Sequence, residues 1–170
     1  MMTPTQAPAW LPPTVAANAI TVAASSENLV VPRTSTPQTN TGQSREAQRT
    51  AAIFTKAAAV PPRWQSFAKC VERRESRGRV NAVNRGSGAA GLFQFMPAWR
   101  HGLPYIVAER IQKFGATKRQ ADTLRAFLWD IKKIEKYPAM YQRIAFAEVI
   151  SDGAWHHWTL RGSSCQKLVP

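Results

Sequence analysis

The chain has 170 residues, which suffices for one domain of ordinary size with a tail but not for two large domains. It contains no apolar run of the about eighteen residues that a membrane-spanning helix needs, and its 2 cysteines are too few for a disulfide-rich miniature protein or a four-cysteine zinc site. The formal net charge of +13 predicts attraction to a polyanion, which includes nucleic acid, an anionic membrane surface and an anionic cell-wall polymer.

The composition changes near Phe54. Residues 1–53 hold six prolines and one aromatic residue, Trp10, whereas residues 54–170 hold the other fifteen aromatics. A segment without large apolar side chains cannot offset its chain entropy, so we expect residues 1–58 to be a disordered extension or tether with a short helix over 45–59. The compact domain is then expected over residues 59–170.

The N-terminal segment does not have the pattern of a cleavable secretory signal. Its first basic residue is Arg33, and the stretch from Thr14 to Ser25 is rich in alanine and only weakly apolar. A signal peptide needs an early positive charge followed by a strongly apolar stretch. We therefore expect no cleavable signal.

The first helix of the domain is expected after Pro61-Pro62, a pair that suits a helix start. Its apolar stripe is spaced at three and four residues and comprises Trp64, Phe67, Ala68 and Val71. Gly78 can end this helix. The stretch from Val80 to Gly91, rich in Asn, Gly and Ser, is where we expect a small β-hairpin.

The remaining chain is also expected to be helical. Pro97 and Pro104 can each begin a helix, and Gly115 can end the second of these. Thr117 and Gln120 form a capping-box pattern before the next helix. Apolar residues at helical spacing then predict a buried stripe that includes Leu124, Phe127, Leu128, Ile131 and Ile134, and we expect the indoles of Trp64 and Trp129 to be buried on such faces.

A last helix is expected from Pro138 to Ile150, ending around Asp152-Gly153 and followed by a Trp-rich segment. The fold class predicted from the sequence is therefore mainly α with a small β-hairpin.

Glu75 is a carboxylate on the apolar stripe of the first helix. It follows Trp64 by eleven residues, which rotates it by only about 20 degrees from that side chain. A carboxylic acid among apolar groups loses hydration of its charged form and holds its proton closer to neutral pH, as a general acid must. The structural alternative is an ion pair with Arg74, Arg77 or Arg79 at the helix end.

The residues that follow Glu75 resemble a known motif. Glu75-Ser76 is followed by Gly88–Pro97, with the sequence GAAGLFQFMP. This resembles the lysozyme-like lytic transglycosylases, which carry a Glu-Ser pair at a helix end and then a Gly-Ala-x-Gly-Leu-x-Gln-x-x-Pro loop. Trp99 and two cysteines that bracket the domain make it more similar to the resuscitation-promoting factors and related peptidoglycan-cleaving domains of actinobacteria and their phages. The motif covers about residues 70–99, and a looser resemblance extends to Cys165.

The resemblance implies a lysozyme-like domain in which Glu75 is the catalytic acid and then the base. It implies that Ser76 supports Glu75, that Gln94 positions the substrate by hydrogen bonds, and that the backbone of Gly91, Leu92 and Phe93 lines a sugar cleft. It also implies a disulfide between Cys70 and Cys165, closing a loop of about 95 residues that in the chain-entropy model stabilises the fold by around 4 to 5 kcal/mol. The alternative for the cysteines is a reactive thiol and a second free one.

Three tryptophans are candidates for sugar binding because flat aromatic rings suit the apolar faces of pyranoses, namely Trp99, Trp155 and Trp158. An amide such as that of Gln94 offers one acceptor and two donors, which suits the acetamido groups of amino sugars. The alternative for each tryptophan is packing in the core.

The chain departs from many lytic transglycosylases, which carry an Ala-Tyr-Asn motif where this chain has Ala145-Phe146-Ala147. The product is therefore left open between an anhydro sugar, closed by the sugar's own 6-hydroxyl, and a hydrolysed end. A second catalytic carboxylate is not obvious. Glu72, Glu148 and Asp152 were the candidates for that role.

Two other motifs have weaker interpretations. Residues 86–91 satisfy G-x-G-x-x-G, but they follow a helix without any βαβ unit, so we expect a tight turn near a sugar rather than a dinucleotide site. His156-His157 has no acidic or cysteine cluster at ligand spacing, so no metal or organic cofactor is expected.

Nucleic-acid binding is the serious alternative for the six basic residues near the proposed site, Lys69, Arg73, Arg74, Arg77, Arg79 and Arg85. No helix-turn-helix, zinc-finger or RNA-recognition signature accompanies them, so no specific nucleic acid is expected.

The resemblance thus implies a peptidoglycan-cleaving glycosidase acting on the β-1,4 bond between N-acetylmuramic acid and N-acetylglucosamine. Its expected partners are glycan strands and, through the basic surface, anionic wall polymers, without insertion into a membrane. We expect it to act at the cell wall as a phage-encoded protein, associated with the virion or released at lysis. The alternative is a non-enzymatic basic protein that binds nucleic acid or wall polymer, or a structural virion protein, on a lysozyme-like scaffold.

Overall fold

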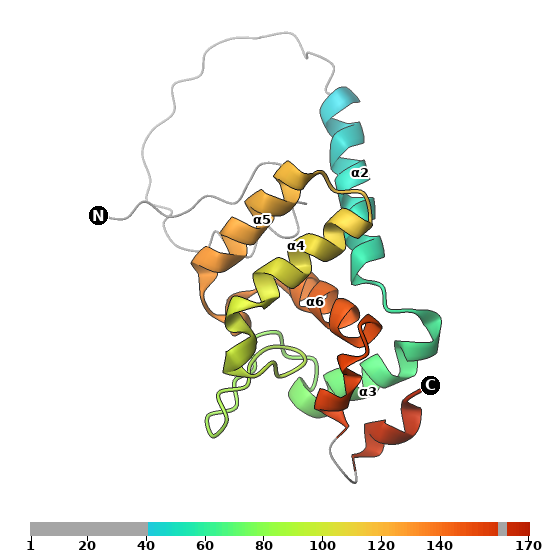
Figure 1. The fold of residues 1–170 in the computed structure, drawn as a ribbon, viewed down its shortest axis with the longest axis vertical. Coiled ribbons are helices and arrows are strands. Elements are labelled where there is room, and N and C mark those ends of the chain that lie inside the picture. The colour runs from blue at the N-terminus through green and yellow to red at the C-terminus, as the bar shows by residue number, and fades with distance from the viewer. Residues whose placement is uncertain (1–40, 160–162) are drawn as a thin grey trace, which may run out of the picture. The chain divides into compact units, whose positions relative to one another are not determined.

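A computed structural model describes residues 41–159 and 163–170. The expectations for residues 1–40, including the extension and the absence of a signal, lie outside the described residues. The described chain is mainly helical, as the sequence predicts (Figure 1). Residues from Ala52 to Pro170 form one compact unit.

This unit begins earlier than residue 59. Helix α2 spans Thr41–Ala58, close to the expected short helix. Ile53, Phe54 and Ala57 are buried in the core, and Phe54 packs edge-on against Tyr141 with ring centroids 5.8 Å apart. The sequence boundary was placed too late because Phe54 is followed by small residues, which gave no sign that this turn of helix is covered.

Helix α3 carries Glu75 and forms as the sequence predicts. A short 3-10 helix, η1 (Pro62–Trp64), leads into α3 (Gln65–Ser76), and Trp64, Phe67 and Val71 are buried. The helix ends because Arg77 and Gly78 both adopt left-handed backbone conformations, with φ of 56° and 78°.

Three further helices make up most of the core. Helix α4 (Leu103–Lys113) packs against both α5 (Lys118–Ile131) and α6 (Ala139–Ser151) (Figure 1). The capping box of Thr117 and Gln120 is confirmed, since each side chain bonds the backbone N–H of the other. Residues 141–150 of α6 are all buried except Arg143, so this helix runs through the middle of the unit.

Short 3-10 helices connect these elements. They are η2 (Pro97–His101), η3 (Ile134–Lys136), η4 (Ala154–Trp158) and η5 (Ser164–Leu168). Pro97 is the first residue of η2, so a helix begins at this proline as the sequence predicts, and it is a short 3-10 helix.

Two local expectations are wrong. Within residues 41–159 and 163–170 no strand forms, and the expected β-hairpin is reduced to two isolated antiparallel bridges, Val83 with Ala90 and Ala90 with Phe95. The side chain of Trp129 is 43% exposed rather than buried. Trp129 follows the buried Leu128 by one residue, which turns it about 100 degrees away from the centre of the stripe.

The helices in the described part of the chain are too short or too polar to cross a lipid bilayer.

Candidate active site

Glu75 lies at the last turn of α3, next to the point where the helix stops. Its side chain is 24% exposed, so the carboxylate is partly buried yet can be reached from solvent. The expected fully apolar surroundings are not what the structure has. The carboxylate makes the ion pair with Arg74 that the sequence analysis considered as the alternative.

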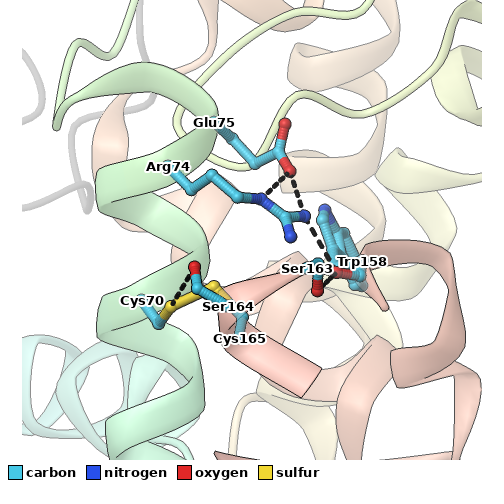
Figure 2. Close-up of a disulfide and its surroundings, with 7 residues drawn as sticks. All are labelled: Cys70, Arg74, Glu75, Trp158, Ser163, Ser164 and Cys165. Carbon is cyan, nitrogen blue, oxygen red and sulfur yellow. Dashed lines mark hydrogen bonds and ion pairs between the residues drawn. A yellow bond between two sulfur atoms is a disulfide. The ribbon is translucent and has the colours of Figure 1, made fainter. Parts of the chain in front are cut away.

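Arg74 holds the carboxylate in a defined position. Its Nε donates to Oε1 of Glu75 at 2.9 Å. Its Nη2 donates to the same oxygen and, at 2.8 Å, to the carbonyl oxygen of Trp158 (Figure 2). The guanidinium therefore connects the end of α3 to η4. A charge-assisted hydrogen bond of this kind fixes the direction of the acceptor as well as contributing energy.

The disulfide implied by the resemblance is present. Cys70 and Cys165 are bonded with their Cα atoms 5.6 Å apart, and they join α3 to η5 (Figure 2). Cys70 precedes Arg74 by one helical turn, so the covalent bond and the Arg74 contact hold the same face of α3 against the C-terminal segment.

Ser76 is a structural residue and not a substrate contact. It is 1% exposed, its Oγ donates to the carbonyl of Glu72 at 3.1 Å, and it accepts from the N–H of Gly78 at 3.1 Å. The hydroxyl thus satisfies backbone groups at the end of the helix. Its proposed supporting role is limited to shaping the turn after Glu75.

The Gly91–Gln94 turn is pressed against α6. A Cβ on Gly91 would lie 2.2 Å from Oε1 of Gln142, and φ at Gly91 is +82°. Both facts require glycine here. Oε1 of Gln142 accepts a 2.6 Å hydrogen bond from the N–H of Leu92, which holds the turn in place.

Gln142 is a residue that the sequence analysis missed. It is 1% exposed, and its Nε2 donates to the carbonyls of Val80, Ile134 and Tyr137 at 3.1, 3.3 and 2.7 Å. One side chain thereby connects the chain after α3, the segment before α6 and the Gly91–Gln94 turn. The signal that could have found it is a glutamine among the mostly apolar residues of α6.

The expected cleft lining by Leu92 and Phe93 is not supported. Both side chains are buried, at 0% and 2% exposure. The N–H of Leu92 is donated to Gln142, and the carbonyl of Phe93 accepts a 2.7 Å hydrogen bond from the indole of Trp158. The N–H of Leu92 and the carbonyl of Phe93 therefore anchor the turn to Gln142 and Trp158 and are not free to bind a ligand.

Gln94 is half-buried and has a left-handed backbone, with φ of 51°. Its Nε2 donates to the carbonyls of Ala82 and Gly91 at 3.3 and 3.1 Å. Both amide hydrogens are thus used inside the loop, and the amide oxygen is the part of Gln94 suited to accept a hydrogen bond from a ligand.

The three candidate tryptophans differ in exposure. Trp158 is 5% exposed and packs edge-on against Phe146 with ring centroids 4.8 Å apart, so it is a core residue and cannot offer a face to a sugar. Trp99 and Trp155 are both half-exposed. These two remain available for ring stacking.

The exposed histidine pair lies between Trp99 and Trp155. The ring of His157 is 5.3 Å from that of Trp99 and 4.5 Å from that of His156, and His156 is 6.4 Å from Trp155. Burial, and after it the neighbouring His156, lower the pKa of His157. A neutral imidazole at neutral pH extends this row of flat rings.

The other carboxylates considered as catalytic partners are placed differently. Glu148 is buried and paired with Arg110 at 2.6 Å and also with Lys113. Burial alone would raise the pKa of Glu148, but the bonds from Lys113 and Arg110 outweigh it and hold that pKa below its ordinary value. Glu148 is therefore a structural ion-pair residue.

Glu72 is paired with Arg143 at 2.9 Å, on a neighbouring face of α3. It lines a pocket that includes neither Glu75 nor Gln94. Asp152 is exposed at the end of α6. Among the residues that the structure describes, none of these carboxylates makes a hydrogen bond or an ion pair with Glu75 or with Arg74. The same part of the chain has no cluster of His, Cys, Asp and Glu that could hold a metal ion.

Comparison of the chain with family models, with curated proteins and with solved structures finds no match in any of the three.

Proposed function

We propose that this chain cleaves the β-1,4 bond between N-acetylmuramic acid and N-acetylglucosamine in peptidoglycan, by lytic transglycosylation or hydrolysis, on a lysozyme-like domain. The observation that carries the proposal is the connection through Trp158. Its indole binds Phe93 of the motif turn, and its carbonyl binds Arg74, which holds Glu75. The two halves of the motif, about 20 residues apart in sequence, are thereby joined by one residue.

In the proposed reaction Glu75 protonates the glycosidic oxygen and then acts as a base toward the 6-hydroxyl of the sugar or toward water. The first step needs the carboxyl group of Glu75 to turn to the substrate, free of its hydrogen bond to Arg74. Arg74 has a second acceptor in the carbonyl of Trp158. We expect the guanidinium to stay on that carbonyl while Glu75 takes up a proton and turns to the substrate.

Sugar recognition is assigned to the exposed groups near these residues. The amide oxygen of Gln94 is suited to an acetamido N–H, and the half-exposed rings of Trp99 and Trp155 are suited to pyranose faces. Such an enzyme would act at the cell wall, and its net charge of +13 would favour adsorption to anionic wall polymers.

The decisive experiment is digestion of purified cell walls by the wild type and by Glu75→Gln, with mass spectrometry of the soluble muropeptides. Removal of a general acid is expected to lower the rate by roughly 100-fold to 10,000-fold, while the melting temperature changes little because the side chain is partly exposed. Anhydro ends would identify a transglycosylase, and reducing ends a hydrolase.

Glu109→Gln is the matched control, since Glu109 is an exposed carboxylate on α4. It should digest walls at the wild-type rate. If the wild type releases no muropeptides but binds wall polymer or DNA in a salt-sensitive manner, the protein is a basic binding protein and the enzymatic proposal is wrong.

A further inference from the structure

We infer that a pocket beside α3 binds the acidic peptide attached to the glycan strand, an inference that rests on the proposed function for the identity of its ligand. The pocket has a volume of about 160 Å³ and is formed by the α2–α3 linker, α3, α6 and Phe93. It is separate from Glu75 and Gln94, which do not line it.

The floor of the pocket is apolar and built on a pair of stacked aromatic rings. Phe93 and Phe146 stack face to face, with ring centroids 3.9 Å apart and planes inclined by 9°. Ala58, Val60 and Ala68 complete the apolar lining. A cavity of this size with such walls suits methyl and other small alkyl groups.

The rim of the pocket is charged. Lys69 is exposed, and Arg143 lies across from Glu72, with which it makes a 2.9 Å ion pair. The two cations Lys69 and Arg143 and the single carboxylate of Glu72 give the rim a net charge of +1. Because Glu72 offsets Arg143, the ammonium of Lys69 is the group that we expect to meet an anionic ligand.

An acidic peptide with small side chains matches both parts of the pocket. The stem peptide of peptidoglycan carries alanine methyl groups and free carboxylates, whereas a glycan strand without it lacks the alanine methyl groups and carries only the lactyl carboxylate of each N-acetylmuramic acid. Glu72 precedes Glu75 by three residues, a rise of about 4.5 Å along the helix. A peptide branching from a glycan bound at Glu75 can therefore extend to the pocket.

Binding of the peptide can be measured without catalysis. The probe is the N-acetylated stem tetrapeptide, titrated into the full chain by calorimetry at low salt. Lys69→Glu reverses the charge at the rim and is expected to weaken binding about tenfold. Ala68→Leu, which fills the floor, should weaken it to a similar degree, with circular dichroism to show that both variants are folded.

Arg73→Glu is the matched control, because Arg73 is exposed one turn further along the same helix and does not line the pocket. It makes the same change in net charge and should alter binding less than about twofold. Equal losses in Lys69→Glu and Arg73→Glu would mean general attraction to a basic surface and would overturn the inference, as would a wild type that does not bind the tetrapeptide.

A second measurement separates this inference from the proposed function. Wild type and Lys69→Glu are compared on glycan strands with peptides and on strands stripped of peptides by an amidase. Lys69→Glu should raise KM only on the peptide-bearing strands. If the wild type cleaves neither substrate, the proposed function is wrong, and the tetrapeptide titration still tests whether the pocket binds the peptide. If Lys69→Glu changes KM equally on both substrates, the pocket does not bind the peptide, while the cleavage activity stands.

Discussion

The indole N–H of Trp158 donates a 2.7 Å hydrogen bond to the carbonyl of Phe93, 65 residues earlier in the chain. The carbonyl of Trp158 in turn accepts from Arg74. A buried tryptophan thus sets the position of the motif turn relative to the helix that carries Glu75, although its own ring cannot reach a ligand.

Trp158→Phe tests this connection. The variant keeps an aromatic ring in the core but leaves the carbonyl of Phe93 without its donor, which is expected to cost about 1 to 3 kcal/mol of unfolding free energy. Wall digestion should fall further than stability explains, since the turn is no longer fixed. Trp155→Phe is the control for stability, as Trp155 is half-exposed and its indole donates no comparable hydrogen bond to any residue within 41–159 and 163–170. Equal effects of the two changes on the melting temperature would contradict the assigned role.

Gly91→Ala is expected to be strongly destabilising. Its Cβ would lie 2.2 Å from Oε1 of Gln142, an atom that cannot move without breaking its bond to Leu92. Gly78 has a similar positive φ, of 78°, but nothing lies within 4 Å of its added Cβ. Gly78→Ala therefore measures the backbone strain alone, about 1 to 2 kcal/mol, and Gly91→Ala should exceed it by at least about 2 kcal/mol in urea unfolding. Equal losses of unfolding free energy in Gly91→Ala and Gly78→Ala would show that the Gly91–Gln94 turn can move away from α6.

Features that depend on neighbouring residues could be predicted from the sequence. The capping box of Thr117 and Gln120 and the end of α3 near Gly78 follow from local backbone needs, and both are present. The stripe of α3 was also found. Helical spacing predicts which face of α3 is buried but not how far along the helix axis the core extends. Glu75 lies at the end of α3, where its side chain is partly exposed and paired with Arg74, and the spacing could not predict this.

The remaining features depend on contacts between distant segments. The roles of Gln142 and Trp158 arise from bonds to residues 50 and 65 positions away, for which their spacing in the chain gives no signal. Composition alone also ranked Trp99, Trp155 and Trp158 together, although only the first two are exposed. Side-chain type predicted which chemistry was available, and packing decided which residues can offer it.

Reduction of the Cys70–Cys165 disulfide should lower stability. The bond closes a loop with a sequence separation of 95 residues. In the chain-entropy model its loss costs around 4 to 5 kcal/mol, measured as the shift in a urea unfolding midpoint with and without reductant. A Cys70→Ser, Cys165→Ser double variant should match the reduced wild type and be insensitive to reductant. An unchanged midpoint on reduction would mean that core packing and the contact of Arg74 with η4 alone hold the C-terminal segment against α3.

Arg74→Gln should lower the rate of wall digestion. The guanidinium fixes the direction of the Glu75 carboxylate, because its Nε donates to Oε1 of Glu75 at 2.9 Å while its Nη2 donates to the carbonyl of Trp158 at 2.8 Å. Without these bonds the carboxyl group is less well oriented, so we expect kcat to fall by about tenfold or more. Arg73→Gln, on the same helix turn but without a bond to Glu75, should digest walls at the wild-type rate. An unchanged rate in Arg74→Gln would show that Arg74 does not position Glu75 for the reaction.

The ion pairs of Glu148 predict a specific loss of stability in acid. The pKa of Glu148 is held below its ordinary value of 4.5 in the folded chain, so the carboxylate stabilises the fold above that value, and this contribution is lost as the pH falls through the lowered folded pKa. Glu148→Gln should cost about 3 kcal/mol at pH 7, because Arg110 stays buried without a carboxylate and keeps only neutral acceptors, the carbonyls of Ala57 and Ala59 and the hydroxyl of Ser151. In thermal unfolding from pH 7 down to pH 2, the difference in melting temperature between wild type and variant should become smaller below about pH 4.5. A difference in melting temperature that does not depend on pH would mean that the packing of the Glu148 side chain, and not its charge, stabilises the junction of α2, α4 and α6.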